Sequence, residues 1–588
     1  MSTLIKTQFN THNASQFVES LDEASNNVYY VFATKGPGTN TTPNSSITNS
    51  NFQVWDEMTF GKRVRPVDAA HMTRKTDWAN NTAYVAYDDR NSLLTGSNYF
   101  VVTSEGDDYH VWKCIANNQS SGNSISKPLY SDVSSSLNTL YIKAADGYQW
   151  RFMYTITESN YTKFTTGDYI SIHTHANASG NAVTGSIDNY IVTNSGNNYN
   201  EFCNGSFLTI SNSTTAVINS SSFTLSPNND FYNNCAIYIK AGTGSGQLRK
   251  ILDYTASTRT ITIDTAWGTN PSTSDSVFEI TPSITINGDG SNATARALVQ
   301  TSTNTIANVE VITRGQDFTY ADITVEANNM NSANLALVRA PMVPAGGHGS
   351  DPIEELEGKH VGISVEYANN EASNIPTDND FSQIGLIKDP LYANVQLNGA
   401  VSGSWTAGEK LTQANTGTFG YIISSNSTSV LVANVYGQFV LGNTTNHANV
   451  SGVSSEATMN VSSLYVNTSE GVRSSFDTFD QRYVFSQTTT SSSVFSEDEK
   501  IVQEDTNANA TVFFANSSKV SVTTLRGTFN INTDNVVTGQ TTGNTSKLTA
   551  QTNPDLVRNA GDILYLNNID AVSRSNTTTE TVRLVITF

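Results

Sequence analysis

Two groups of acidic residues are the first candidates for chemistry in this sequence. Asp88 and Asp89 are adjacent in the segment YDDRN, and Glu105, Asp107 and Asp108 lie close together in SEGDDYH. A glycoside hydrolase needs two carboxyl groups that face each other across the scissile bond, and these residues could supply them. Acidic residues in turns are, however, mostly exposed surface groups. We therefore predict no catalytic residue and keep a glycoside hydrolase as the least favoured hypothesis.

Three histidines are candidates for metal binding or for general-base catalysis. His173 and His175 are two residues apart, which places both on one face of a strand, but no third ligand is near them in the sequence. His348 lies in the loop GGHGSD, and the chain contains no G-x-S-x-G nucleophile motif. Residues 287–293, NGDGSNA, lack the spaced acids and the closing glutamate of an EF-hand. We expect no metal and no cofactor.

The segment 238–254, YIKAGTGSGQLRKILDY, contains three alternating glycines, Gly242, Gly244 and Gly246. A phosphate-binding loop would place such glycines between a strand and the start of a helix, where backbone N–H groups face the anion. Residues 257–264, STRTITID, instead alternate as in a strand, and no Gly-Lys-Ser/Thr ending is present. The pattern predicts a glycine turn between two strands and no nucleotide site.

The composition indicates a β-rich protein that does not bind nucleic acid. Charged residues are 14% of the 588 residues and aromatic residues are 10%, with many Asn, Ser and Thr residues. Strands that alternate apolar residues with Thr or Ser, joined by Asn and Gly turns, fit this usage. The formal net charge is -20, from 52 acidic and 32 basic residues, whereas a nucleic-acid interface is basic.

The three cysteines, Cys114, Cys203 and Cys235, are far apart and form no C-x-x-C pair. We expect neither a disulfide framework nor a zinc site, and free thiols fit folding in a reducing cytoplasm. The N-terminal residues lack the basic and apolar regions of a signal peptide. No apolar run approaches the 18 residues of a membrane span, so we expect no membrane partner.

Local patterns predict a few elements. Asn13 can cap a helix over residues 14–21, where Phe17 and Leu21 are four residues apart. The other local predictions are a strand over 27–34, a polar loop over 35–51, a short helix over 67–78, and an irregular connector over 338–367 with a short helix within 351–360.

Two internal repeats organise the rest of the chain. Residues 187–199 align without gaps on 306–318, each with a strand, a glycine turn and an aromatic residue. Residues 402–439 align on 491–529, and the matched residues are 90 positions apart in the sequence. The matched residues of the second pair include Trp405 with Phe495, Lys410 with Lys500, Gln413 with Gln503, Val430 with Val520, Gly437 with Gly527, and Phe439 with Phe529. A β module used twice explains such matches better than catalysis does.

An ordered series of segments carries a resemblance to a known family. The series is 52–78, 99–115, 144–156 and 561–588. It contains an Arg-Asp-Trp-like element, Lys75-Thr76-Asp77-Trp78, in which the arginine stands earlier, at Arg74. It also contains Val111-Trp112-Lys113-Cys114, Asp146-Gly147-Tyr148 followed by Trp150, and a final strand ending at Phe588. The series resembles the baseplate wedge protein of T-even-type contractile-tailed bacteriophages, the gene-eight product family. The middle of the chain departs from that family and is enlarged by β modules.

The repeats and the resemblance together predict the architecture. We expect a mainly β, multidomain protein with a small α+β part, in which antiparallel sandwich-like or barrel-like modules are inserted between the N- and C-terminal segments of one core domain. The expected parts are an N-terminal core domain over 1–165, a β domain over 166–330 with an inserted module near 211–283, a connector over 331–395, tandem β modules over 396–550, and a returning C-terminal segment over 551–588.

The resemblance implies a structural protein rather than an enzyme. The expected function is a wedge subunit of a contractile tail baseplate, located in the virion after folding and assembly in the host cytoplasm. The implied partners are other baseplate wedge proteins, a second copy in a homodimer, and tail fibres. Wedge proteins of the family carry no catalytic residues that could be transferred to this chain. A tail-fibre or receptor-binding adhesin is the alternative.

Overall fold

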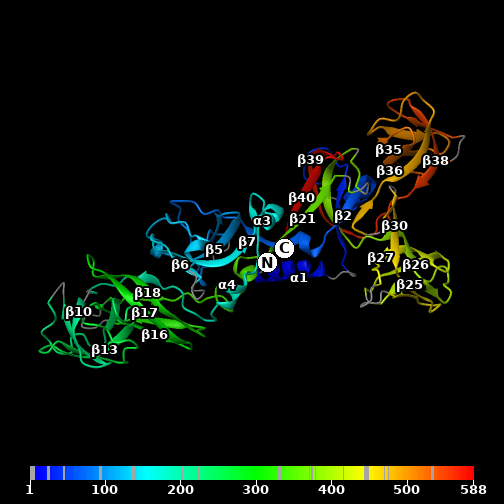
Figure 1. The fold of residues 1–588 in the computed structure, drawn as a ribbon. Coiled ribbons are helices and arrows are strands. Elements are labelled where there is room, and N and C mark those ends of the chain that lie inside the picture. The colour runs from blue at the N-terminus through cyan, green and yellow to red at the C-terminus, as the bar shows by residue number, and fades with distance from the viewer. Residues whose placement is uncertain are drawn as a thin grey trace. The chain divides into compact units, whose positions relative to one another are not determined.

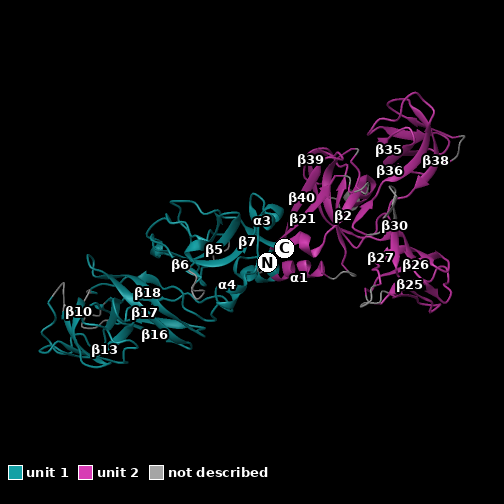
Figure 2. Cartoon of the chain, in the orientation of Figure 1, with its two compact units in different colours: residues 1–11, 71–359 teal, residues 12–70, 360–588 magenta. Residues whose placement is uncertain are grey.

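The computed structural model describes most of the chain, and the described part is mainly β (Figure 1). The described residues are 7–22, 27–43, 47–91, 94, 96–133, 140–199, 203–220, 224–326, 334–369, 371, 375–377, 379–414, 416–442, 449–468, 471–473, 476–531 and 535–588. The chain forms two compact units: unit 1 comprises residues 1–11 and 71–359, and unit 2 comprises 12–70 and 360–588 (Figure 2). The predicted fold class, mainly β and multidomain with barrel-like modules, is confirmed.

Unit 1 is built first around a four-stranded antiparallel sheet. Its order is β4 (Phe100–Glu105), β5 (Asp108–Asn117), β7 (Tyr148–Ile156) and β6 (Tyr141–Lys143). Trp112 and Trp150 pack on one face of the sheet, and Val111 and Tyr154 pack on the other. Because both faces are covered, the middle of β5 is continuously buried, including its charged residue Lys113.

Shorter elements of unit 1 surround this sheet. They are β3 (Ala69–Arg74), which begins at the boundary with unit 2, β8 (Tyr169–Ser171), and the helices α3 (Glu158–Phe164), α4 (Ala176–Gly180) and α5 (Pro352–Glu355). The short helix predicted within 351–360 is confirmed by α5. The helix predicted over 67–78 is wrong, because β3 pairs with β8 and overrides the weak local helix pattern.

The rest of unit 1 contains a closed barrel and a small sheet. The barrel consists of β10 (Cys203–Ile210), β11 (Thr215–Ser220), β12 (Ala236–Ala241), β13 (Leu248–Thr255), β14 (Thr260–Ile263) and β15 (Val277–Thr281). The sheet consists of β16 (Ile284–Gly288), β19 (Ala321–Val325), β20 (Leu337–Arg339) and β9 (Ile191–Asn194), and beside it runs the long pair β17 (Ser291–Gln300) and β18 (Thr305–Gln316).

Unit 2 contains a sheet that joins the two ends of the chain. Its order is β32 (Thr478–Asp480), β2 (Met58–Arg63), β1 (Tyr29–Thr34), β22 (Asp380–Lys388) and β39 (Asp562–Ser573). β21 (His360–Ala368) pairs with β40 (Thr579–Thr587). The helix α1 (Thr7–Ser20) begins before Asn13, so Asn13 is not its cap, and α2 (Ile47–Glu57) overlaps the predicted polar loop. The strand predicted over 27–34 is confirmed by β1.

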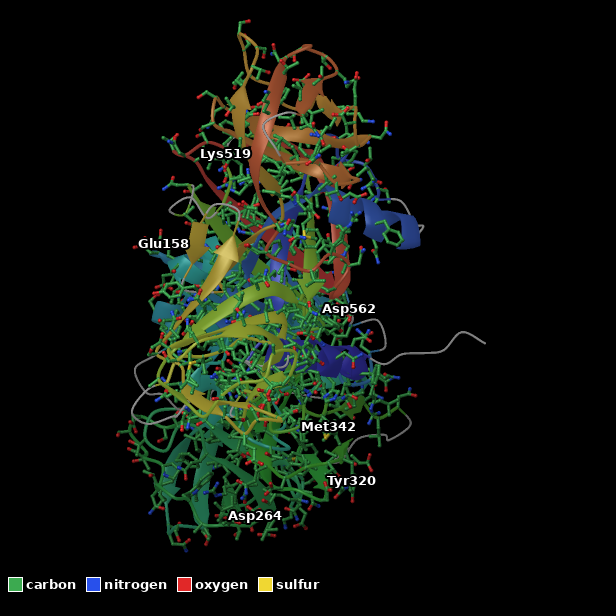
Figure 3. The ribbon with its side chains drawn as sticks, turned by 90° about the vertical axis from the view of Figure 1, so that its right-hand side faces the viewer. Glu158, Asp264, Tyr320, Met342, Lys519 and Asp562 are labelled. Carbon is green, nitrogen blue, oxygen red and sulfur yellow. The ribbon has the colours of Figure 1, made fainter. Side chains whose placement is uncertain are left out.

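Two modules of unit 2 repeat one strand arrangement. Module A comprises β23 (Tyr392–Asn398), β24 (Val401–Ser402), β25 (Lys410–Gln413), β26 (Phe419–Ser425), β27 (Ser429–Tyr436), β28 (Asn449–Gly452), β29 (Thr458–Asn460), β30 (Ser463–Thr468) and β31 (Gly471–Arg473). Module B is a closed barrel of β33 (Tyr483–Thr489), β34 (Lys500–Gln503), β35 (Ala508–Ala515), β36 (Lys519–Arg526), β37 (Val536–Gly539) and β38 (Thr545–Thr552). The order β23-β27-β26-β25-β28 in module A matches β33-β36-β35-β34-β37 in module B. Side chains fill both modules, and Lys519 marks the start of β36 (Figure 3).

A buried glutamate holds the same turn in both modules. In module A, Glu409 accepts hydrogen bonds from the backbone N–H groups of Thr406, Ser454 and Ser455, at 2.7, 3.0 and 2.9 Å. In module B, Glu499 accepts equivalent bonds from Ser496, Thr541 and Thr542, at 2.7, 3.2 and 3.1 Å. A carboxylate that accepts several backbone N–H bonds ties the end of one strand to a distant turn.

A buried glutamine makes a second contact common to both modules. The Gln413 side chain donates to the carbonyl of Val440 at 2.9 Å and accepts from the N–H of the same residue at 2.9 Å. Gln503 exchanges the same pair of bonds with Asn530, at 3.0 and 2.6 Å. The aligned glutamines are therefore structural, and each replaces one step of a strand ladder by a side-chain amide.

We predict that Glu499→Ala lowers the free energy of unfolding of module B by about 2–4 kcal/mol, because it removes the charged acceptor of three backbone N–H groups. Differential scanning calorimetry of the full chain measures the thermal transition of the module. Glu504→Ala is the matched control, because Glu504 is exposed in the next turn. A Glu499→Ala transition that coincides with that of Glu504→Ala would show that the carboxylate does not hold the turn.

Candidate functional site

The acidic residues that sequence analysis singled out make structural contacts. The carboxylate of Asp88 forms two hydrogen bonds with the guanidinium of Arg339 on β20. Burial raises the pKa of Asp88, but the bonds from Arg339 and from the backbone N–H of Arg90 outweigh it and hold the pKa below its ordinary value. Asp89 lies 3.9 Å from the same guanidinium. This pair of aspartates therefore contacts β20 through Arg339.

The second acidic group belongs to the hairpin between β4 and β5. Glu105 accepts a hydrogen bond of 2.7 Å from the backbone N–H of Tyr130 and longer bonds from that of Ser131. It thereby holds the short helical turn at Tyr130–Asp132. Asp108 is paired with Glu105 across the hairpin, and Asp107 is exposed at its tip. Glu105 acts as a cap in this arrangement.

The histidine pair and the segment 287–293 also have structural contacts. The ring of His173 lies 2.9 Å from the hydroxyl of Ser171, and the ring of His175 packs edge-on against Phe152. Burial lowers the pKa of both histidines. Asp289, within 287–293, accepts hydrogen bonds from the backbone and hydroxyl of Thr319. Among the described residues, no group of three His, Cys, Asp or Glu side chains could hold a metal ion.

The three-glycine segment is a turn between β12 and β13, as predicted. Gly242, Gly244 and Gly246 all have positive φ, at 78°, 80° and 90°. Asp275 accepts from the backbone N–H of Thr243 at 3.0 Å, so a carboxylate of the chain itself binds a backbone N–H of this loop. The loop is a structural turn of the barrel.

Three buried ionisable side chains of unit 1 meet in one cluster, which consists of Lys113, His348 and Glu355. The Lys113 Nζ lies 2.8 Å from Glu355 Oε2 and 3.0 Å from His348 Nδ1. All three side chains are at most 2% exposed. The ring of Tyr87 covers the ammonium group, whose nitrogen is 4.0 Å from the ring centre. Of these three residues, the sequence pointed to His348 alone as a candidate for chemistry.

Local backbone geometry places His348 and Glu355 beside Lys113. Gly347 has a positive φ and lies so close to Val183 that an added Cβ would come within 2.4 Å of its carbonyl oxygen. Asp351 caps α5 by accepting from the N–H groups of Ile353 and Glu354, which fixes the orientation of Glu355. The N–H of Gly349 donates to Glu355 Oε1 at 2.6 Å. The backbone conformation of the glycine-rich connector is therefore fixed by these contacts.

The electrostatics of the cluster favour a fixed ion pair. Burial lowers the pKa of Lys113, and the charge of Glu355 opposes this shift. Burial also lowers the pKa of His348, and the charge of Lys113 adds to the effect. Burial raises the pKa of Glu355, but Lys113 and His348 outweigh it and bring the pKa to about 2. At neutral pH, Glu355 is ionised beside Lys113 and His348 is neutral.

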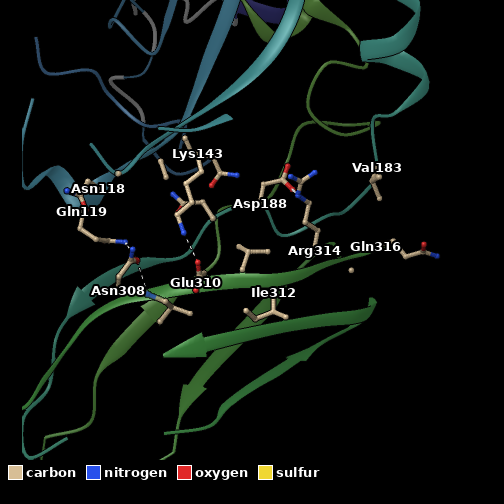
Figure 4. Close-up of a pocket in the computed structure, with 17 residues that line it drawn as sticks. Asn118, Gln119, Lys143, Val183, Asp188, Asn308, Glu310, Ile312, Arg314 and Gln316 are labelled. Carbon is tan, nitrogen blue, oxygen red and sulfur yellow. Dashed lines mark hydrogen bonds and ion pairs between the residues drawn. The ribbon is translucent and has the colours of Figure 1, made fainter. Parts of the chain in front are cut away.

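A polar cavity of about 550 Å³ lies beside β18 in unit 1 (Figure 4). Lys143 on β6 reaches Glu310 on β18 at 2.6 Å, and Arg314 lies 3.4 Å from Asp188, so the charges of the lining compensate each other. The remaining polar lining is dominated by amides, namely Asn118, Gln119, Gln149, Asn189, Asn308 and Gln316. Amides donate and accept hydrogen bonds without charge, so this lining suits a neutral ligand rich in hydroxyl groups.

We predict that Lys113→Met destabilises unit 1 by about 3–5 kcal/mol, because it leaves Glu355 as a buried, uncompensated charge. The matched control is Lys143→Met, which removes a lysine that is 67% exposed from a comparable ion pair. The control should cost at most about 1 kcal/mol. Urea unfolding of the full chain at pH 7, followed by near-ultraviolet circular dichroism, compares the two variants.

The double variant Lys113→Met/Glu355→Gln separates charge from packing. It removes both charges but keeps an acceptor for the N–H of Gly349, so it should recover at least half of the lost stability. The wild-type contribution of Glu355 is complete above pH 4.5, its ordinary pKa, and is lost as the pH falls toward 2. The double variant should lack this acid-dependent loss. Equal effects of Lys113→Met and Lys143→Met would contradict a buried ion pair.

No protein-family model matches this chain, and no curated protein matches it. Within the described ranges, no helix has the length and apolar character needed to cross a membrane.

Proposed function

We propose that the protein is a non-catalytic structural component of a contractile-tail baseplate in a bacteriophage virion, where it binds neighbouring baseplate proteins. The series of segments that resembles the wedge family is the first support for this proposal. A homodimer, other wedge proteins and tail fibres are the proposed partners. Folding and assembly in the host cytoplasm, with the free thiol of Cys114, belong to the same proposal.

The observation that carries the proposal is the way in which the first and last parts of the resemblance meet in unit 2. β2, from the segment 52–78, and β39, from the segment 561–588, belong to one five-stranded sheet. Modules A and B are inserted between β22 and β39 of that sheet. A core closed by both ends of the chain, carrying repeated β modules, suits a particle component that presents several surfaces to its neighbours.

We expect the protein to be part of purified phage particles. Blotting gradient-purified particles with antibody against residues 400–540 tests its presence, and immunogold electron microscopy with the same antibody locates it. Label at the baseplate rim is the expected result. Label along the fibres would favour the adhesin, and absence from the blot of particles that react with a control antibody against the tail would contradict the proposal.

The polar cavity beside β18 favours a second candidate function, a receptor-binding adhesin that recognises a neutral glycan. We expect, on this candidate, that saturation-transfer NMR with the full chain detects glucose, galactose, mannose or N-acetylglucosamine. Gln149→Leu in the cavity should abolish the transfer, whereas Gln551→Leu on β38 should leave it unchanged. Transfer to none of the four sugars would remove the observation that favours the adhesin.

A further inference from the structure

The outer face of β26 and β27 in module A carries a group of apolar side chains, which we call the module A patch. It consists of Phe419, Tyr421, Ile423, Leu431 and Tyr436. Tyr421 is 43% exposed and Ile423 is 46% exposed on β26. The ring of Tyr436 stacks on that of Phe419 at 5.3 Å. The patch thus combines three aromatic side chains on two paired strands.

Module B provides an internal comparison for this patch, because aligned residues lie on the same face of β35 and β36. Phe513, aligned with Ile423, is 2% exposed, and Ser521, aligned with Leu431, is fully buried. Thr523 on the same face is 4% exposed. At positions 513, 521 and 523 this face is therefore buried in module B, whereas Tyr421 and Ile423 on the same face of module A are exposed.

The cover of the module B face comes from other parts of unit 2. The guanidinium of Arg482 lies 4.9 Å from the ring centre of Phe513, and the side chain of Asn379 donates to the Phe513 carbonyl at 2.8 Å. α2 contacts β36, and Asp56 at its C-terminal end pairs with Arg526. The module B face is thus buried by protein, including a helix that brings an acidic residue to a basic one.

The face of module A contains more aromatic residues than the aligned face of module B, as expected if the first is an interface with another protein and the second an internal contact. Phe419, Tyr421 and Tyr436 of module A align with Asn509, Thr511 and Arg526 of module B. Aromatic residues are enriched at the centres of protein interfaces, because they bury large areas at little cost in side-chain entropy. The exposed copy is therefore the more aromatic one, which is the reverse of what solvent exposure alone favours.

We propose that the module A patch docks a helix of a neighbouring virion protein, whose apolar side covers Tyr421 and Ile423. The side chain of Lys410 lies over the ring of Phe419, with its nitrogen 3.8 Å from the ring centre. The partner helix places an acidic residue beside this ammonium, as α2 places Asp56 beside Arg526 in module B. This inference rests on the proposed function, because it assigns the partner to the same particle.

Photocross-linking in assembled particles tests the inference. The full chain with p-benzoylphenylalanine at position 421 is supplied during infection by a phage that lacks its own copy, and purified particles are irradiated. Position 421 should cross-link to a helical segment of another virion protein. Position 511, the aligned site of the covered face, should cross-link only within the chain.

The outcomes separate this inference from the proposed function. If the chain is present in particles but position 421 cross-links to nothing, to a second copy, to a glycan or only within its own chain, the inference is overturned and the structural function stands. If the chain is absent from particles, the proposed function fails, and the inference fails with it. A cross-link from position 511 to a foreign protein would invalidate the comparison of the two faces and overturn the inference.

A pair of substitutions provides an independent measurement. Ile423→Arg should lower incorporation of the chain into particles by about tenfold or more, the effect of losing one central contact of an interface. The control is Leu252→Arg on the barrel of unit 1, at a residue that is 52% exposed. Thermal unfolding of both purified chains must match the wild type. Equal incorporation of the two variants would overturn the inference.

Discussion

Strand β22 is the element on which the rest of unit 2 depends, because both ends of the chain must pair with it. β1 pairs along its whole length with one edge of β22, and β39 pairs with the other edge. The modules between β22 and β39 thus form one long insertion whose two ends are held together by the sheet. The entropic cost of closing such a loop grows only slowly with the number of residues in it. This is why modules A and B can be inserted without loss of the sheet. The sheet in turn holds the modules by their first and last strands.

The packing of both faces of β1 explains why the sheet remains stable with the two modules inserted. Tyr30 and Phe32 point into the core shared with module A, whereas Val31 and Ala33 point into the core with β21 and β40. All six residues of the strand are buried. A strand that is apolar on both faces fixes two cores at once, so a shift of its register by one residue would exchange the side chains of both.

Sequence patterns identified the repeated modules but not the charged core of unit 1. The matches of Gln413 with Gln503 and of Lys410 with Lys500 lie inside one period, and adjacent Glu409 and Glu499 turned out to hold the module turns. Lys113 gave no such signal, because its partner Glu355 is 242 positions away and is reached only through the fold. Residues 67–78 were misjudged for a similar reason, since their strand depends on pairing with β8. Local patterns therefore predict elements that are stabilised locally and miss those that depend on a distant partner.

The barrel of unit 1 is related to module B in a way that sequence alignment did not reveal. Around this barrel the neighbouring strands are β10-β11-β14-β13-β12-β15. The neighbours are the same as in module B when β14 is matched with β33, β15 with β34, and β10 to β13 with β35 to β38. One hairpin supports this correspondence: the Asn212 side chain accepts from the N–H of Thr214 at 2.8 Å, as Asn516 does from Ser518 at 3.0 Å.

Repetition of this kind separates the requirements of folding from those of function. Features present in both copies, such as Glu409 and Glu499, are explained by the closure of the module. A feature present in one copy only, such as the aromatic residues of the module A patch, is not needed to fold the module, because module B forms the same strands with Asn509 and Thr511 in those places. Folding of the module therefore does not account for these aromatic side chains, and contact with something outside the module is what we propose for them. The difference between the two copies is therefore more informative about function than either copy is alone.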